Sequence, residues 1–173
     1  MLPQIKRILC ATDLSDNSAY VLRYAMNSAK KHDAGIIILF VLEPLSATAH
    51  ALTLAYLTAG QENKISEERL AYVKDRINTQ LRIVCEKELI NDPKCANSVE
   101  SIELCEGFPA EMILRKADEL NCAAIVMGTH GKGFIRNTFL GSTSKRVLRR
   151  TRKPVFIIPL PQEEADIGLF DLD

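Results

Sequence analysis

Glycine and hydroxyl residues recur at a fixed spacing in the last third of the chain. Gly128 and Gly131 follow an apolar run, and Gly141 comes directly before the hydroxyl residues Ser142–Ser144. Glycines let the backbone turn tightly and approach a ligand, and free N–H groups at a helix N-terminus attract negative charge. Serine and threonine hydroxyls add further hydrogen-bond donors. This chemistry favours a phosphate group as the ligand.

A strand and a helix must position these residues. The run Cys122–Met127 is too short for an isolated helix and precedes a glycine, which is typical of a strand buried on both faces. The helical pattern around Val147 puts the glycine and its hydroxyl neighbours at a helix N-terminus, where such residues cap helices. The predicted order is strand, glycine loop and helix N-terminus. An ordinary strand-to-helix connection with turn glycines is the alternative interpretation.

The spacing differs from the common phosphate-binding motifs. It is not GxxxxGK[ST], because Gly133 precedes an apolar residue, and it is not GxGxxG, because Arg136 occupies the third glycine position. It matches the pattern Gly-x2-Gly-x9-Gly-Ser, which begins at Gly128 and ends at Ser142. In this motif the chain resembles the ATP-binding branch of the universal stress protein family, and the resemblance covers about residues 4–160. It implies ATP with Mg²⁺ or Mn²⁺ held through the phosphates, and no metal ligand from the protein is predicted.

Length and charge narrow the class of protein. The 173 residues suffice for one domain with a core, and we expect a nucleotide-binding domain at 1–161 followed by an acidic segment at 162–173. The 22 basic residues balance 22 acidic ones, so no overall field favours nucleic acid or a membrane. The apolar runs are too short to span a membrane and no signal-peptide core is visible, which predicts a cytoplasmic protein.

Cysteine usage argues against a disulfide framework and against a zinc site. The chain has 5 cysteines, an odd number, and none of them forms a CxxC pair. Cys10, Cys105 and Cys122 lie in apolar strand patterns, where we interpret them as small buried hydrophobic residues. Cys95 lies in a polar run and is the cysteine that we expect to be exposed.

Strand and helix patterns alternate along the whole chain. Apolar runs predict strands at 5–11, 35–42, 122–127 and 153–159, and an alternating pattern predicts a strand at 98–105 with one more exposed face, which suits a sheet edge. Helical periodicity predicts helices after Ser15 or Asp16, from about 65 to 89, from Pro109 and from Gly141 onwards. This alternation implies an α/β fold, a Rossmann-like, doubly wound five-stranded parallel sheet with helices on both faces. The family resemblance adds the strand order 3-2-1-4-5. The segment 43–60 has no clean period and is interpreted as a lid, a partly helical insertion or an interface.

With that strand order the ends of the first and fourth strands open into one crevice. Asp13 ends the first strand, where a carboxylate can accept hydrogen bonds from ribose or adenine or help to hold a metal. The alternative is a local role, in which it caps the next helix or forms an Asx-turn. The resemblance places Val41, Met127 and Gly128 near the adenosine and the later glycines near the phosphates. The full set of implied ATP contacts is Ala11, Thr12, Asp13, Val41, Met127, Gly128, His130, Gly131, Gly141, Ser142 and Thr143.

The family resemblance implies an ATP-binding regulatory protein, a nucleotide-dependent switch in a stress response, and we expect little or no ATP hydrolysis. The stretch 127–144 contains no carboxylate that could position a water molecule, and no catalytic residue is predicted. Two alternatives remain: a nucleotide-free interaction protein of the same fold, and a slow ATPase or adenylating enzyme. Adenylating enzymes use a glycine-containing loop after the first strand, and the stretch 11–18 has no glycine.

Two further patterns concern partners. The stretch 145–153 is rich in lysine and arginine, which indicates either the cationic end of a helix or a surface for an acidic partner. No aromatic residues interleave with it, so we predict no nucleic-acid binding. The apolar stretch 155–158 would form an edge strand, which predicts a homodimer that pairs through the last strand. The regulatory partner itself is not identified by the sequence.

Overall fold

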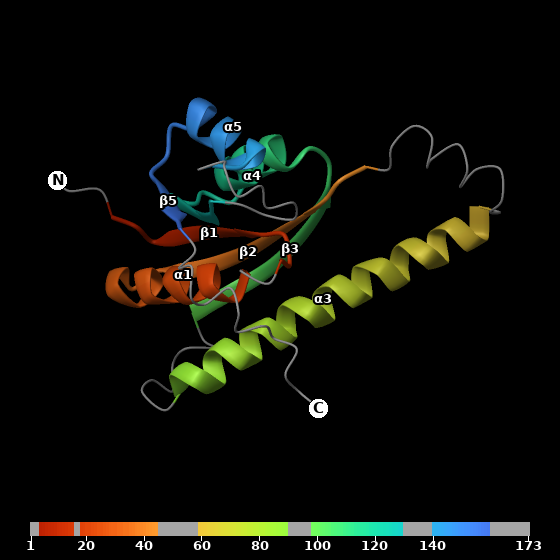
Figure 1. The fold of residues 1–173 in the computed structure, drawn as a ribbon, viewed down its shortest axis with the longest axis horizontal. Helices are drawn as coiled ribbons and strands as arrows, with labels where there is room; N and C mark the ends of the chain where they lie inside the picture. The colour runs from red at the N-terminus through yellow and green to blue at the C-terminus, as the bar shows by residue number, and fades with distance from the viewer. Residues whose placement is uncertain (1–3, 16–17, 45–58, 90–97, 130–139, 160–173) are drawn as a thin grey trace.

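The computed structural model describes residues 4–15, 18–44, 59–89, 98–129 and 140–159 (Figure 1). The strands in this part are β1 (Arg7–Thr12), β2 (Gly35–Leu42), β3 (Val99–Glu106), β4 (Ala124–Gly128) and β5 (Val155–Ile158). The helices are α1 (Ser18–His32), α3 (Ala59–Leu89), α4 (Pro109–Glu119) and α5 (Ser142–Arg150). Strands and helices alternate as the sequence predicts.

All strand pairs are parallel, and the strand order is β3-β2-β1-β4-β5. This order confirms the predicted doubly wound α/β fold. The direction of winding reverses at β1, where Cys10 pairs with Ile38 of β2 on one side and with Val126 of β4 on the other. The carboxyl ends of β1, β2 and β4 therefore lie side by side, at the switch point where ligands bind in this class of sheet.

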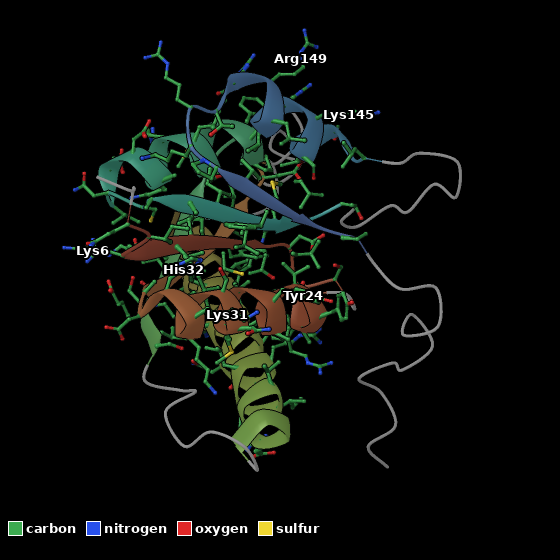
Figure 2. The ribbon with its side chains drawn as sticks, turned by 90° about the vertical axis from the view of Figure 1, so that its left-hand side faces the viewer. Lys6, Tyr24, Lys31, His32, Lys145 and Arg149 are labelled. Carbon is green, nitrogen blue, oxygen red and sulfur yellow. The ribbon has the colours of Figure 1, made fainter. Side chains whose placement is uncertain are left out.

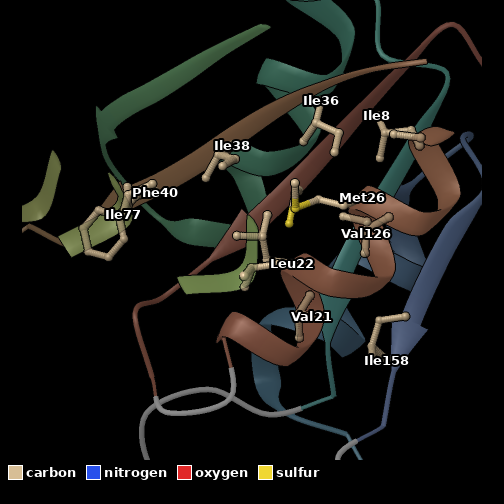
Figure 3. Close-up of a cluster of buried hydrophobic side chains, with 14 of the residues drawn as sticks. Ile8, Val21, Leu22, Met26, Ile36, Ile38, Phe40, Ile77, Val126 and Ile158 are labelled. Carbon is tan, nitrogen blue, oxygen red and sulfur yellow. The ribbon is translucent and has the colours of Figure 1, made fainter. Parts of the chain in front are cut away.

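Two layers of helices cover the sheet (Figure 1). α1 and α3 pack on one face, and Figure 3 shows Leu22 and Met26 of α1 against Ile38 and Val126 of the sheet. α4 and α5 pack on the other face, where Val147 of α5 is fully buried. Alternate residues of each strand face opposite layers, which explains why the central strands β1, β2 and β4 are largely apolar, whereas the edge strand β3 carries three glutamates.

The helix α3 is longer than the sequence predicts. It begins at Ala59, so the end of the segment 43–60 is helical, while residues 45–58 lie outside the described part. Val73, Ile77 and Val84 form the buried stripe that joins the core. The N-terminal half of α3 projects beyond the sheet (Figure 1), and Tyr72 in this helix is largely exposed. None of the helices in the described ranges is long and apolar enough to cross a membrane.

Two of the cysteines behave as the sequence analysis expects. Cys10 and Cys122 are buried, and Cys105 is partly buried. Burial raises the pKa of the Cys10 thiol to about 12. It also raises the pKa of Cys122 to about 11, although Arg7 and Lys153 lower it in part. These thiols stay protonated at neutral pH and pack as small apolar groups. Cys95 lies outside the described residues.

Candidate functional site

Six of the predicted contact residues end three neighbouring strands. Ala11, Thr12 and Asp13 lie at the end of β1, Val41 is next to last in β2, and Met127–Gly128 end β4. Thr12 pairs with Phe40 of β2, and Cys10, two residues earlier, pairs with Val126, two residues before the end of β4, so these ends are level with one another. The structure therefore brings the three groups of residues to one edge of the sheet.

The apolar residues of this edge share the face that α4 and α5 cover. Ala11 and Val41 are partly buried against the cluster that contains Met127 and Val147. Met127 is only 5% exposed, so its side chain forms part of the floor beneath α5. A ligand bound on this face would contact apolar side chains at the strand ends and, above them, the N-terminus of α5.

A short hydrogen-bonded connection holds the first turn of α5 at the end of β4. The Gly141 N–H donates to the Thr129 carbonyl at 2.7 Å. The Ser144 hydroxyl donates to the Gly128 carbonyl at 2.9 Å, with a longer contact of 3.4 Å to the Thr129 carbonyl. Ser144 is 3% exposed. Among the three hydroxyl residues expected to face a ligand, Ser144 is therefore occupied by the backbone of β4.

The first turn of α5 carries no negative charge of its own. Gly141 is the N-cap residue and makes no side-chain cap hydrogen bond, and the first turn contains no acidic residue. The first intrahelical bond joins the Lys145 N–H to the Gly141 carbonyl at 3.0 Å. The N–H groups that precede it have no acceptor within a helix, and they make the N-terminus electropositive. Ser142 is exposed and Thr143 is half-buried, so both hydroxyls can reach a bound anion.

The turn after β1 is closed by its own polar side chains. One carboxylate oxygen of Asp13 accepts hydrogen bonds from the Ser15 N–H at 3.1 Å and from the Ser18 hydroxyl at 3.3 Å. The Thr12 hydroxyl accepts from the N–H of Leu14 at 3.2 Å, and Leu14 adopts a φ of 58°. A bulky residue in this region is strained and needs such support. Asp13 therefore forms an Asx-turn five residues before the first residue of α1, and its contact with a ligand stays a prediction.

Two predicted contact residues lie outside the described part of the chain. His130 and Gly131 belong to the stretch 130–139, which also contains Lys132 and Arg136. Among the residues that the structure describes, no group of three or more histidine, cysteine or acidic side chains could hold a metal ion.

Phe108 is a candidate contact that the sequence analysis missed. It is 61% exposed and forms the N-cap of α4, directly after the end of β3. The Gly107 N–H donates to the Leu42 carbonyl at 2.9 Å, which fixes this loop beside the end of β2. Gly107 has a φ of 147°, and a Cβ there would lie 2.9 Å from Met112. The sequence pattern that could have identified Phe108 is an aromatic residue between a glycine and a proline that starts a helix, at the carboxyl end of a strand.

The parallel sheet, its strand order and the helix N-terminus at its switch point define a Rossmann-like, doubly wound α/β protein. Residues 4–159 match the model of the universal stress protein family. The chain belongs to this family.

Related proteins match nearly the whole chain. The universal stress protein MJ0531 of Methanocaldococcus jannaschii is 26% identical over 167 residues, which cover 92% of this chain and 85% of that protein. A universal stress protein of Thermus aquaticus is 30% identical over 154 residues, which cover 88% of this chain and 98% of the relative.

Solved structures confirm the fold. The M. jannaschii protein MJ0577 superposes with a TM-score of 0.69 at 20% identity, covering 92% of this chain and 99% of that one. A universal stress protein in complex with cAMP gives a TM-score of 0.57 at 21% identity, covering 92% and 100%. An Archaeoglobus fulgidus universal stress protein in complex with dAMP gives 0.55 at 20% identity, covering 91% and 99%. Structural neighbours of this chain therefore bind adenine nucleotides.

Proposed function

We propose that this protein binds ATP, with Mg²⁺ or Mn²⁺ held through the phosphates, and acts as a nucleotide-dependent switch in a stress response. The observation that carries the proposal is the hydrogen bond from Ser144 to the Gly128 carbonyl. It holds an electropositive helix N-terminus at the switch point of the sheet, where an anion gains from both the helix dipole and the free N–H groups. The cAMP and dAMP complexes of structural neighbours support an adenine nucleotide as the ligand.

The two ends of the nucleotide would meet different chemistry. The phosphates contact Gly141, Ser142 and Thr143 at the start of α5, together with His130 and Gly131. The adenosine lies over the strand ends, against Ala11, Thr12, Asp13, Val41, Met127 and Gly128. At the edge of the site Phe108 stacks on the adenine base, because an exposed aromatic ring stacks on a planar base.

ATP turnover should be slow or absent. Fast phosphoryl transfer to water needs a residue that positions the water and cations that stabilise the transferring group. Asp13 is the carboxylate at the end of β1, and one of its oxygens already accepts two hydrogen bonds in the β1–α1 turn. His130 is the remaining candidate base. Multiple turnovers per second that disappear in His130→Ala would show an ATP-hydrolysing enzyme in place of a binding switch.

Calorimetric titration with ATP and Mg²⁺ tests the binding proposal. Valine at Gly131 or Gly141 puts a branched side chain where the backbone must approach phosphate, so both variants should bind ATP at least tenfold more weakly. Ala71→Val on the exposed surface of α3 is the control and should bind as the original chain does. Circular dichroism reports whether the fold is intact. Wild-type protein that takes up no ATP would favour the nucleotide-free interaction protein instead.

We also infer that the protein forms a homodimer through β5. This strand lies at one edge of the sheet, and Phe156 within it is 38% exposed. An uncovered apolar edge invites pairing with a second copy, while Pro159 limits its length. Light scattering at tens of micromolar should report a dimer, and a strictly monomeric mass would contradict the inference. We further propose that residues 1–161 form the nucleotide-binding domain and that the protein is cytoplasmic.

A further inference from the structure

The basic side chains of α5 outnumber the acidic side chains that pair with them in the described part of the chain. Arg150 pairs with Glu111 of α4 at 3.6 Å, and Lys153, just beyond the helix, pairs with Asp118 of α4 at 3.1 Å. Lys145 and Arg149 are exposed on the same helix. Within the described part of the chain neither of them forms an ion pair. Figure 2 shows both side chains pointing out from α5, away from the sheet.

Lys145 and Arg149 lie on the side of α5 opposite the fully buried Val147, because each is two residues from it and such residues point about 200° apart. Arg150 marks the α4 side because of its ion pair with Glu111. Residues two apart on a helix point about 200° apart, so Leu148 lies on the opposite side. Lys145 and Arg149 fall within about 100° of Leu148 on the helical wheel. Leu148 is 39% exposed. We call Lys145, Leu148 and Arg149 the cationic face of α5.

The chain leaves the sheet beside this helix. β5 ends at Ile158, whose carbonyl accepts from the Thr129 N–H at 3.1 Å, and the Thr129 carbonyl accepts from the N–H of Gly141 at 2.7 Å. One residue, Thr129, therefore bridges the end of β5 and the N-cap of α5. Since β5 is the edge strand beyond β4, the following residues start at the N-terminal end of α5, on the uncovered edge of the sheet.

The segment that follows has the complementary chemistry. The charged residues of the segment 162–173 are all acidic: Glu163, Glu164, Asp166, Asp171 and Asp173. Its last residues include three large apolar ones, Leu169, Phe170 and Leu172. Asp166 lies seven positions after Pro159, a distance of up to about 24 Å when the chain is extended. The nine residues of α5 extend over only about 13 Å. The first three carboxylates can therefore reach both cations of the face.

We propose that the acidic segment 162–173 docks on the cationic face of α5 of its own chain. Its carboxylates pair with Lys145 and Arg149, and its apolar residues cover Leu148. Exposed ion pairs are weak one by one and screened by salt, so the docking depends on several pairs together and on ionic strength. The acidic partner that the lysine and arginine pattern suggested is then part of the same molecule.

Zero-length cross-linking of the full chain with a carbodiimide tests the proposal, because it joins a lysine only to a carboxylate in contact with it. At about 20 mM salt, Lys145 should link to the peptide that contains Glu163, and at about 500 mM salt the yield should fall several-fold. The ion pair of Lys153 with Asp118 is the internal positive control. Lys31 on α1, which packs on the other face of the sheet (Figure 2), is the negative control and should link rarely.

Charge variants make the test specific. Arg149→Gln should lower the Lys145 link several-fold, whereas Arg69→Gln on the exposed surface of α3 changes charge equally and should leave it unchanged. A mixture of isotope-labelled and unlabelled chains should give no mixed pairs, because the contact is within one chain. Equal linking to Lys31 and Lys145, no link to Lys145, or mixed pairs would overturn the proposal. The cross-linking is done without nucleotide, so its outcome does not depend on whether the protein binds ATP.

Discussion

The contact between Ser144 and the end of β4 gives a quantitative test of how the site is built. Ser144→Ala removes a hydroxyl that is 3% exposed and that donates to the Gly128 carbonyl at 2.9 Å. Loss of a donor to a buried carbonyl costs about 1–3 kcal/mol. The better helix propensity of alanine returns up to about 0.5 kcal/mol. We expect a net loss of about 1–2 kcal/mol in the free energy of unfolding, or roughly 2–8 °C in Tm for a chain of this size.

Ser142→Ala is the matched control, because it removes the same hydroxyl two residues earlier. Ser142 is exposed and is the first residue of α5. Its removal should change the free energy of unfolding by less than about 0.5 kcal/mol. If the hydroxyl donates to phosphate, the variant loses a hydrogen bond to a charged group, worth about 1.5–3 kcal/mol. That loss corresponds to roughly 10- to 100-fold weaker ATP binding.

Urea unfolding of the nucleotide-free protein, followed by circular dichroism, and calorimetric titration with ATP separate the two roles. Ser144→Ala should lower stability without ligand, and Ser142→Ala should lower affinity alone. A Ser144→Ala protein as stable as the original would mean that this hydroxyl does not hold α5 to β4. A Ser142→Ala protein with full affinity would remove the serine from the phosphate site.

Three further predictions concern single side chains. Phe108→Ala should weaken ATP binding by about 1–3 kcal/mol through loss of stacking, whereas Phe156→Ala at the sheet edge should not; equal affinities in calorimetry would exclude a base-stacking role for Phe108. Burial raises the pKa of Cys10 from 9.0 to about 12, so its contribution to stability is complete below pH 9 and is lost as the pH rises towards 12, at up to about 1.4 kcal/mol per pH unit. Urea unfolding between pH 8 and pH 11 should show this slope, and Cys10→Ala should reduce it; an unchanged slope would contradict the assignment. Gly107→Ala should cost about 1–3 kcal/mol of stability, because its φ of 147° is strained for alanine and its Cβ would meet Met112; a variant with the original Tm would refute this.

The strands were predictable because parallel strands buried on both faces are continuous apolar runs. The predicted strand 35–42 coincides with β2, which begins at Gly35. The first strand was placed two residues early, since Ile5 and Lys6 continue the pattern but β1 begins at Arg7. Arg7 is the residue that pairs with Gly35, so the partner strand sets this boundary. Pairing between strands is not visible in the local pattern of one strand.

The boundaries of the helices and the different roles of the Ser142 and Ser144 hydroxyls depend on tertiary contacts. Apolar periodicity marks the part of α3 that touches the core, around Val73 and Ile77, and it does not reveal the turns from Ala59 onwards. In the site, Ser142 and Ser144 are alike in the sequence. Only the fold brings Ser144 against Gly128, which lies 16 positions earlier in the chain, and leaves Ser142 exposed. The motif predicts a site at this place, and the structure shows which of the two serines holds α5 to the end of β4.

The helix α5 connects the two proposals. Its first turn would receive the phosphates of ATP, and Lys145, which lies at the end of that turn, would pair with the acidic segment. Bound phosphate adds negative charge beside Lys145 and weakens its attraction for carboxylates, because like charges at short range oppose one another. Binding linkage is reciprocal, so the docked segment must weaken ATP binding by the same factor. ATP can shift the equilibrium between the docked and the released segment only if it binds these two states with different affinities. Release of the acidic segment from α5 would therefore give bound ATP a conformational consequence that does not require hydrolysis.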